Sequence, residues 1–573
     1  MLAQFVLPWA INWLTPLWIL SVGVATGLIF LLLGWALAAA LSLTPLGKLA
    51  EQPGKRGTVA ALVGVACFLL LGGIFVVPRM SAGADPDSLI VLSCLLAIAS
   101  ALTGVGLVWL NSRRTVAEIP SAVREGPLWP IFILVAAMSA FAVVGALASF
   151  NPLELLTSLA RLPFVGTVTK TFTVPGTDFD ALGEAKDPPQ HALDVAFRVN
   201  ELKFVTFHSS GNLSLNLKKA GDYDLEPIFR IPADEDVLWR INPVAFKEEE
   251  VSGMYVRNQG AQDAELSVIV SSQPQHPQVW TVVPTAISVV VIFLLYILQR
   301  AAMPRLSAVS LSTLKSELAQ PLFIVTMLTG LTALILFLWI PYNTFGEDIK
   351  VLKDSGMTLI MVLCIIQAIW AASTSVSDEI EGRTALTVLS KPINRRSFII
   401  GKFLGIAWTV ALMFVFLGVM LMIVTAYKPI YDSREGGAAE ATWQLCHLET
   451  IGVVPGLLLA FMETLVLAAL SVAISTRLPL LANFVLCFSI YVMGHLTPLL
   501  VQSSAGDFAP VEFVATLLAA ALPVLDHFNI QAAIAAGINV PPDYLGWAFL
   551  YCLIYGVIAL LLALVLFEDR DLA

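Results

Sequence analysis

The sequence predicts a polytopic α-helical membrane protein of about eleven transmembrane helices with an inserted extracytoplasmic β-sandwich domain. Hydrophobic residues make up 58% of the chain and charged residues only 13%, which is about half the charged share usual in soluble domains. Several apolar runs exceed the roughly 20 residues that cross a bilayer as a helix. One long break between these runs, residues 151–280, instead alternates apolar and polar residues, as β-strands do.

Counting the apolar runs gives the expected spans and the division of the chain. The spans lie near residues 17–41, 57–78, 88–110, 128–150, 281–298, 321–342, 356–376, 404–427, 451–475, 479–501 and 546–567. We therefore expect an N-terminal four-helix membrane region at 1–150, a β-rich domain at 151–280, a fifth helix with its linker at 281–304, and a six-helix core at 305–573. The first sixteen residues lack the basic region of a cleavable signal peptide, so the first run should remain as a span.

The distribution of Lys and Arg predicts the orientation. One set of short connections holds sixteen of these residues, whereas the opposite set holds only five, namely Arg79, Lys350, Lys353, Lys428 and Arg434. Basic residues gather in cytoplasmic loops. We therefore expect the N-terminus outside, the C-terminus in the cytoplasm and the β-rich domain on the outer side of the membrane.

The β-rich domain differs from the rest of the chain in charge and in pattern. It contains 18 Asp and Glu against 11 Lys and Arg, a balance that argues against nucleic acid or anionic lipid as its ligand. Apolar residues share single faces at 193, 195, 197 and 199, at 213, 215 and 217, and at 266, 268 and 270. A sandwich of seven to nine short strands fits this alternation. Whether it binds a ligand or only spaces the assembly stays open.

A charged connector between the seventh and eighth expected spans is the most informative segment for function. Residues 378–405 read DEIEGRTALTVLSKPINRRSFIIGKFLG and hold eight charged residues. Placing them in the bilayer would cost about 20 kcal/mol or more, at about 2.5–3.5 kcal/mol for each charge, so the segment must lie in water beside the membrane. Ser375 and Asp378 have the spacing of a capping box, which predicts a new short helix that Pro392 ends.

The connector resembles the cytoplasmic loop between the second and third core spans of type-2 ABC exporter permeases, including those of nitrous oxide reductase maturation systems. The likeness is carried by E-I-E-G-R-T, S-K-P-I-N-R-R and I-I-G-K-F-L-G, and extends from about Arg305 to Ala573. In that family the loop carries a coupling helix, here 379–390, that docks on an ATPase subunit. The resemblance implies a coupling surface formed by Glu379, Glu381, Arg383, Thr384, Lys391, Pro392, Arg395, Arg396, Gly401 and Lys402.

The resemblance also implies partners and a location. A permease of this kind works with a separate ABC ATPase that holds ATP and Mg, so no cofactor is expected in this chain. A second permease copy, as a homodimer or a paired subunit, would complete the pathway in a bacterial plasma membrane. The function implied is export of an unknown substrate or transmission of force to an outer partner. The alternative is a non-transporting receptor or scaffold whose β-sandwich binds a ligand.

Polar residues inside the expected spans are candidates for the translocation pathway, because burying them in lipid is costly. Glu463 is the only acidic residue well inside any core span, and Gln367, Asn483 and His495 are the other candidates. Each could instead form a structural hydrogen bond between helices. The connection at 502–545 is moderately apolar and predicts one or two short helices at the outer surface. Lys315 and Glu317 match the family's amphipathic connecting helix.

Other site types find little support. Five of the six cysteines fall in expected spans and Cys446 in an expected outer loop, so neither a disulfide framework nor zinc spacing is present. No G-x-x-x-x-G-K-[ST] motif occurs, since Arg396 stands five residues before Gly401 and Phe403 follows Lys402, and the chain should hold no ATP site of its own. His447 and Glu449 share an expected outer loop, where a hydrated surface is the favoured interpretation and a metal site is not expected.

Overall fold

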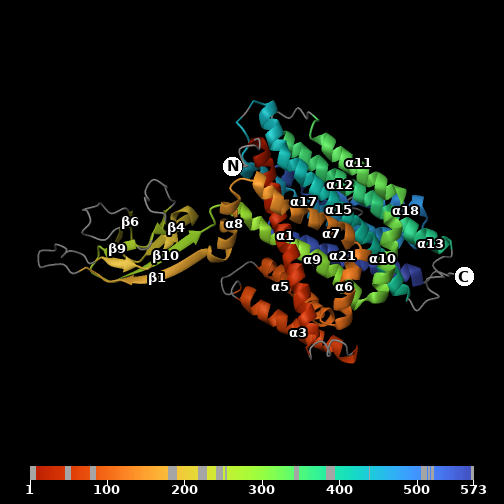
Figure 1. Ribbon diagram of the computed structural model, residues 1–573, viewed down its shortest axis with the longest axis horizontal. Coiled ribbons are helices and arrows are strands. Elements are labelled where there is room, and N and C mark those ends of the chain that lie inside the picture. Colours follow the sequence, from red (N-terminus) through yellow and green to blue (C-terminus); the bar gives the residue numbers. More distant parts are fainter. Residues whose placement is uncertain are drawn as a thin grey trace. The chain divides into compact units, whose positions relative to one another are not determined.

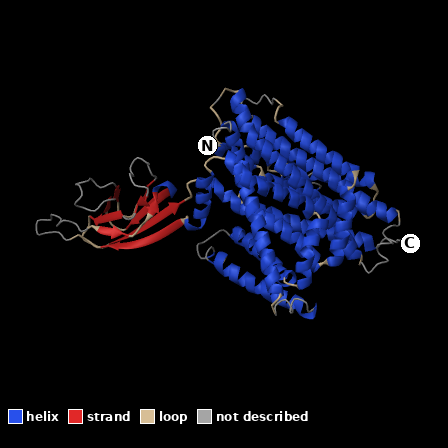
Figure 2. Ribbon diagram, in the orientation of Figure 1, coloured by secondary structure: helices blue, strands red, loops and turns tan. Residues whose placement is uncertain are grey.

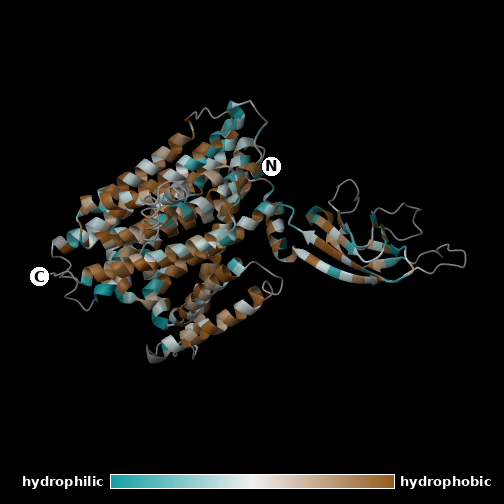
Figure 3. Ribbon diagram, turned by 180° about the vertical axis from the view of Figure 1, so that it is seen from behind, coloured by the Kyte–Doolittle hydropathy of each residue, from teal (hydrophilic) through white to brown (hydrophobic). Residues whose placement is uncertain are grey.

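A computed structural model describes residues 8–44, 53–77, 80, 86–177, 190–216, 229–239, 250–251, 254–340, 347–382, 394–437, 439–504, 513, 517 and 522–568. The chain forms two compact units, one of residues 1–150 and 281–573 and the other of residues 151–280. Figure 2 shows helices throughout the first unit and strands in the second. Figure 3 shows apolar residues along most helices of the first unit and alternating hydropathy along the strands of the second.

The first unit begins with the helices that precede the expected six-helix core. They are α1 (Pro8–Ser42), α3 (Pro53–Phe75), α5 (Pro86–Leu110), α6 (Arg113–Glu125), α7 (Leu128–Val144) with the 3-10 turn η2 (Gly145–Ala148), and α9 (Val282–Ala302). Glycines let α1 approach α9 closely, because a Cβ at Gly27 would lie 2.8 Å from the carbonyl oxygen of Ala286. Such small-residue contacts are typical of helices packed within membranes. Figure 1 shows α1 and α9 side by side.

The core follows, with α12, α15 and α17 at its centre. Its elements are α10 (Pro304–Leu318), α11 (Pro321–Phe337), α12 (Asp348–Ala372), the π-helical turn η7 (Ser373–Ser377), α13 (Asp378–Glu381), α15 (Arg395–Glu435), α16 (Trp443–Gly452), α17 (Val454–Ser475), α18 (Leu480–Ser504), η8 (Leu525–Phe528), α20 (Gln531–Ala535) and α21 (Pro542–Glu568). One large hydrophobic cluster runs through these helices, with Met357, Ile406 and Val466 fully buried in it. The cluster fixes the positions of the polar side chains described below.

The number of membrane spans agrees with the sequence prediction in its coarse form. Ten helices of the described residues are long and apolar enough to cross a bilayer, and α10 with α11 forms an eleventh candidate that is bent by 66°. The bend falls at Gln320, directly before Pro321 at the start of α11. Proline favours the first turn of a helix and disfavours helical geometry in the residue before it. The short helices expected at 502–545 are present as η8 and α20.

The second unit contains two four-stranded antiparallel sheets that share one hydrophobic core. The first has the order β1 (Thr167–Val174), β10 (Ala264–Ser272), β4 (Leu202–Ser209), β7 (Asp236–Trp239), and the second the order β2 (His191–Leu193), β9 (Met254–Asn258), β5 (Leu213–Asn216), β6 (Phe229–Ile231). A short pair, β3 (Phe197–Arg198) with β8 (Glu250–Val251), completes the strands that the structure describes. Val205 and Phe207 of one sheet meet Leu215 and Val256 of the other in the shared core.

The strand alternation predicted from the sequence holds at most positions. Leu193 and Phe197 are buried, whereas Val199 opens the 3-10 turn η4 (Val199–Glu201). Leu266 and Val268 are buried and Val270 is half-buried. Leu217 lies outside the described residues. The described strands number ten, slightly more than the seven to nine expected, because β3 and β8 are only two residues long.

Candidate functional site

The predicted start of a new helix at Ser375 is wrong. The chain stays helical from α12 through the π turn into α13, and Ser377 and Asp378 both have right-handed helical backbone angles. The Ser375 side chain is buried and has no hydrogen-bond partner among the described residues, so it caps nothing. The capping-box spacing was misleading because packing extends α12 beyond its apolar run. This segment therefore continues α12 rather than starting a separate helix.

An ion pair joins the end of this extended helix to α15. The Nζ of Lys402 lies 2.5 Å from Oε1 of Glu379 and donates a hydrogen bond to it. Lys402 is buried, and its ammonium also lies 5.4 Å from the ring centroid of Phe398. A buried lysine is stable only when a carboxylate compensates its charge. The pair therefore fixes the first turn of the charged connector against α15.

A second polar contact joins the π turn, which directly precedes the charged connector, to the bend between α10 and α11. The hydroxyl of Thr374, within the π turn, donates to Oε1 of the buried Glu317 over 3.3 Å, and Gln320 donates to the same hydroxyl over 3.3 Å. The indole nitrogen of Trp370 donates to Oε1 of Gln320 over 2.5 Å. Sequence reasoning assigned Glu317 to a connecting helix but missed Thr374 and Gln320, because nothing in the local pattern shows that they meet.

Gly401 proves to be a packing residue between α15 and α10. A Cβ at Gly401 would lie 2.7 Å from the Cβ of Val309, and one at Gly405 would lie 2.6 Å from the Cβ of Thr313. The two glycines are four residues apart and so lie on one face of α15. They let α10 lie against α15 immediately beside Lys402.

Arg395 and Arg396 open α15, where both are exposed. The guanidinium of Arg395 donates to the carbonyl oxygen of Glu568 over 2.8 Å and lies 5.7 Å from the ring centroid of Phe567. It therefore bonds the last turn of α21, whose carbonyls lack partners within the helix. Arg383, Thr384, Lys391 and Pro392, with most of the expected coupling helix 379–390, lie outside the described residues, and the Glu381 side chain is not described.

Among the intramembrane candidates, Asn483 forms the densest set of hydrogen bonds. Its amide nitrogen lies 2.8 Å from the hydroxyl oxygens of Ser373, Ser471 and Ser475, and its amide oxygen accepts from the thiol of Cys487 over 3.2 Å. These contacts join α18 to α17 and to the first residue of the π turn. Asn483 thus connects the π turn at the end of α12 to α17 and α18.

Glu463 and His495 form a pair between α17 and α18. The Nε2 of His495 lies 3.5 Å from Oε1 of Glu463, and the Glu463 side chain is fully buried. The ring of His495 also lies 4.6 Å from that of Tyr491. Gln367, on α12, is fully buried, and neither atom of its amide has a hydrogen-bond partner among the described residues. The structure thus joins two of the four candidates directly and leaves Gln367 between helices.

These polar groups lie at different positions along the axes of α12, α17 and α18. Glu463 and Ser475 are twelve residues apart on α17, which is about 18 Å at 1.5 Å per residue. We call Glu463, His495, Gln367, Asn483 and the three serines that Asn483 contacts the polar column. Isolated polar groups in a membrane core are rare. Their presence on the same three helices marks this part of the core as different from its lipid-facing helices.

The interpretation of five basic residues as lying in short loops was wrong for four of them, because Lys350 and Lys353 lie in α12 and Lys428 and Arg434 lie in α15, whereas Arg79 lies outside the described residues. Lys353 lies within α12, is 2% exposed and pairs with Glu449 of α16. Lys428 lies within α15, is 1% exposed, and has Asp432 at 2.8 Å and Asp348 at 3.9 Å. The sequence suggested loops because single charges interrupt apolar runs. In the structure Lys353 is compensated by a carboxylate of another helix, whereas Lys428 is compensated mainly by Asp432 one turn later in its own helix.

The predicted outer loop around Cys446 is also a helix. Cys446 and His447 are buried in α16, and Thr442 caps its start by accepting a hydrogen bond from the Leu445 amide. Among the described residues no three His, Cys, Asp or Glu side chains gather in a way that could hold a metal ion. The polar contacts described here join helices to one another.

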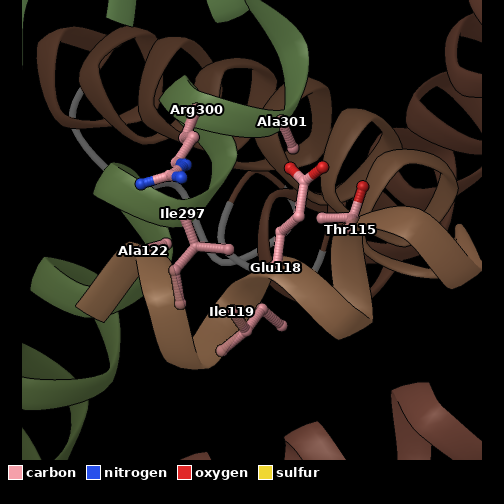
Figure 4. Close-up of a pocket in the computed structure, with 7 residues that line it drawn as sticks. All are labelled: Thr115, Glu118, Ile119, Ala122, Ile297, Arg300 and Ala301. Carbon is pink, nitrogen blue, oxygen red and sulfur yellow. The ribbon is translucent and has the colours of Figure 1, made fainter. Parts of the chain in front are cut away.

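A small pocket lies between α6 and α9, apart from these contacts. Figure 4 shows Arg300 projecting from α9 and Glu118 from α6. Arg300 is 3.8 Å from Glu125, at the end of α6. The other lining residues are small or apolar: Thr115, Ile119, Ala122, Ile297 and Ala301. The pocket lies beside an amphipathic helix whose apolar face, including Val116 and Ala122, is buried.

Comparison with known proteins places these observations in a family. A family model described as ABC-2 family transporter protein matches residues 115–572, about four-fifths of the chain. The match begins well before residue 305, where the resemblance was expected to begin, and so includes the fourth span and the β-rich unit. No curated protein matches the chain.

Proposed function

The chain belongs to the ABC-2 family of transporter proteins and is a membrane-embedded permease component of an ABC transporter, and from this we propose that it couples ATP hydrolysis by a separate ATPase subunit to export or to force transmission across the membrane. The ATPase would dock on residues 379–390 and hold ATP and Mg itself. A second permease copy, identical or paired, would complete the pathway. The protein would lie in a bacterial plasma membrane with its N-terminus and β-rich unit outside and its C-terminus in the cytoplasm.

The observation that carries the proposal is the Glu379–Lys402 pair. The coupling segment begins as a direct extension of α12. A force that the ATPase exerts on the start of this segment would therefore act on α12 without an intervening loop. The ion pair would transmit the same force to α15. The hydrogen bond from Thr374 to Glu317 would transmit this force to the bend between α10 and α11. Rigid elements joined in this way move together when a domain closes on them.

The polar column supports a pathway close to these helices. Asn483 joins α18 and α17 to the π turn, so movement of α12 reaches the helices that carry Glu463 and His495. The Glu463–His495 pair would then separate or close as the helices tilt. A kinship with the permeases of nitrous oxide reductase maturation systems rests on the connector motif alone, and the cargo is open.

Charge reversal tests the coupling role. We expect Glu379→Lys or Lys402→Glu alone to lower the ATPase activity of the complex in nanodiscs, because each places like charges side by side, and the double reversal to restore most of it. The matched control is the exposed pair of Glu347 and Lys350, also 2.5 Å apart, whose reversal should leave activity unchanged. Full activity and co-purification of the ATPase in both single variants would contradict the coupling role.

Cysteine accessibility tests the pathway without knowledge of the cargo. In a chain whose native cysteines are replaced, Glu463→Cys and His495→Cys should react with small water-soluble thiol reagents, and ATP should change the rate. Val466→Cys is the control, because Val466 is equally buried on α17 but lies among apolar side chains. Equal protection of all three positions with and without ATP would exclude a pathway along the polar column.

A further inference from the structure

The β-rich unit has an unpaired apolar surface at one end, formed by α8 (Pro152–Arg161), the 3-10 turn η3 (Leu162–Phe164) and the 3-10 turn η6 (Pro277–Thr281). The exposed fractions are 77% for Leu153, 42% for Leu156, 77% for Phe164 and 61% for Trp280. We call these four residues the collar. A soluble surface seldom gathers large apolar side chains without a function.

The two collar residues of α8 lie on a different face of the helix from its buried side chains. Leu155 and Ser158 are buried, and they lie on the opposite side of the helix from Leu153 and Leu156. Positions 153, 156 and 160 have the i, i+3, i+7 spacing of one helical stripe, and Phe164 follows four residues later. The face of α8 that carries Leu153 and Leu156 is therefore apolar and exposed.

Polar contacts hold α8 firmly in this position. Arg161 donates two hydrogen bonds to the carboxylate of Glu201, over 2.8 Å and 2.7 Å. Glu154 lies 3.7 Å from His276, just before the turn that carries Trp280. The collar is thus anchored to the unit, and its exposure is a property of the folded unit.

Chain connectivity shows what can cover the collar. The candidate span Leu128–Ala148 ends five residues before Leu153, and Trp280 lies within the candidate span Pro277–Ala302. Five residues reach at most about 18 Å when fully extended. The collar is therefore tethered at both ends beside a bilayer. Trp and Phe beside Leu are typical of segments that lie at the membrane–water interface.

From this tether and this composition we propose that the collar inserts into the headgroup region of the bilayer and seats the β-rich unit on the membrane surface. The interaction is apolar and needs no anionic lipid, since the unit carries more acidic than basic residues. It is independent of the ATPase and of transport, so it can fail while the proposed function stands.

The test is depth-dependent fluorescence quenching in the full-length protein. An environment-sensitive probe is attached to Leu153→Cys and Phe164→Cys in a chain without native cysteines, reconstituted in phosphatidylcholine vesicles that contain brominated lipid. The control is Leu238→Cys on β7, where an apolar side chain is also exposed, at 53% against 77% for Leu153 and for Phe164. We expect bromine near the headgroup to quench the two collar probes about twofold or more and to leave the control unchanged, as for side chains held at the interface.

Two outcomes would overturn the proposal. If aqueous iodide reaches the collar probes as readily as the control and brominated lipid does not quench them, the collar lies in water. If neither quencher reaches them, a protein surface covers the collar, either a second copy or a partner. Because the substituted side chains are exposed, the variants should fold, and a monodisperse gel-filtration peak checks this.

Discussion

Replacing Gly405 with alanine should force α10 away from α15. The added Cβ would lie 2.6 Å from the Cβ of Thr313 and 2.8 Å from the carbonyl oxygen of Ser310. Both distances are far below ordinary contact, and the backbone oxygen cannot rotate away. Overpacking of this kind costs about 1–3 kcal/mol. Alanine regains about 0.5–1 kcal/mol of helix preference over glycine, so we expect a net loss of up to about 2.5 kcal/mol.

Gly556 provides the matched control for this change. It also lies inside a long apolar helix, α21, but no atom is within 4 Å of the position a Cβ would take. Alanine there should raise stability by about 0.5–1 kcal/mol. Thermal unfolding of the purified protein in one detergent measures both variants, and the melting temperatures should move in opposite directions. Equal shifts would refute the close packing of α10 on α15.

Three further predictions follow from the polar contacts. Lys353→Met should destabilise the fold by about 3 kcal/mol or more, because it leaves the carboxylate partner on α16 uncompensated. Lys350→Met, at an exposed pair, should cost under about 1 kcal/mol. The melting temperatures of the two variants measure this difference. Asn483→Ala should cost about 1–3 kcal/mol, because it removes the amide that donates to the three serine hydroxyls. It should lower ATPase activity in nanodiscs more than binding of the ATPase, as pull-down would show. Arg395→Ala should increase proteolysis at the end of α21, whereas Arg396→Ala should not; equal proteolysis of both would contradict the contact between α15 and α21.

The sequence predicted the membrane architecture well because apolar runs and strand alternation depend on neighbours along the chain. The buried positions of Leu215 and Val268 were predicted from the occurrence of apolar residues at every second position along their strands. The predicted helix start at Ser375 was wrong because packing outweighed a local capping signal. Lys353 and Lys428 were placed in loops because their carboxylate partners lie on other helices or at the next turn. The pattern of hydrophobicity did not show that either lysine lies inside a helix.

The candidate site was only partly accessible from sequence. The connector motif predicted one coupling surface that includes Glu379 and Lys402, and the structure shows that these two side chains form an ion pair. The intramembrane candidates were found by their polarity, but the contact of Glu463 with His495 and the three serines around Asn483 depend on how helices pack. Thr374 and Gln320 gave no signal, because a threonine and a glutamine near a span boundary are common.

The π turn at Ser373–Ser377 determines the direction in which the side chains of the following helix, α13, point from the helix axis. Such a turn takes up one residue more than an α-helical turn, and one residue corresponds to about 100° of rotation. Deleting a single residue there would keep the helix continuous while swinging Glu379 to another side of its axis, out of reach of Lys402. The orientation of Glu379 thus depends on a one-residue insertion as well as on its ion pair with Lys402.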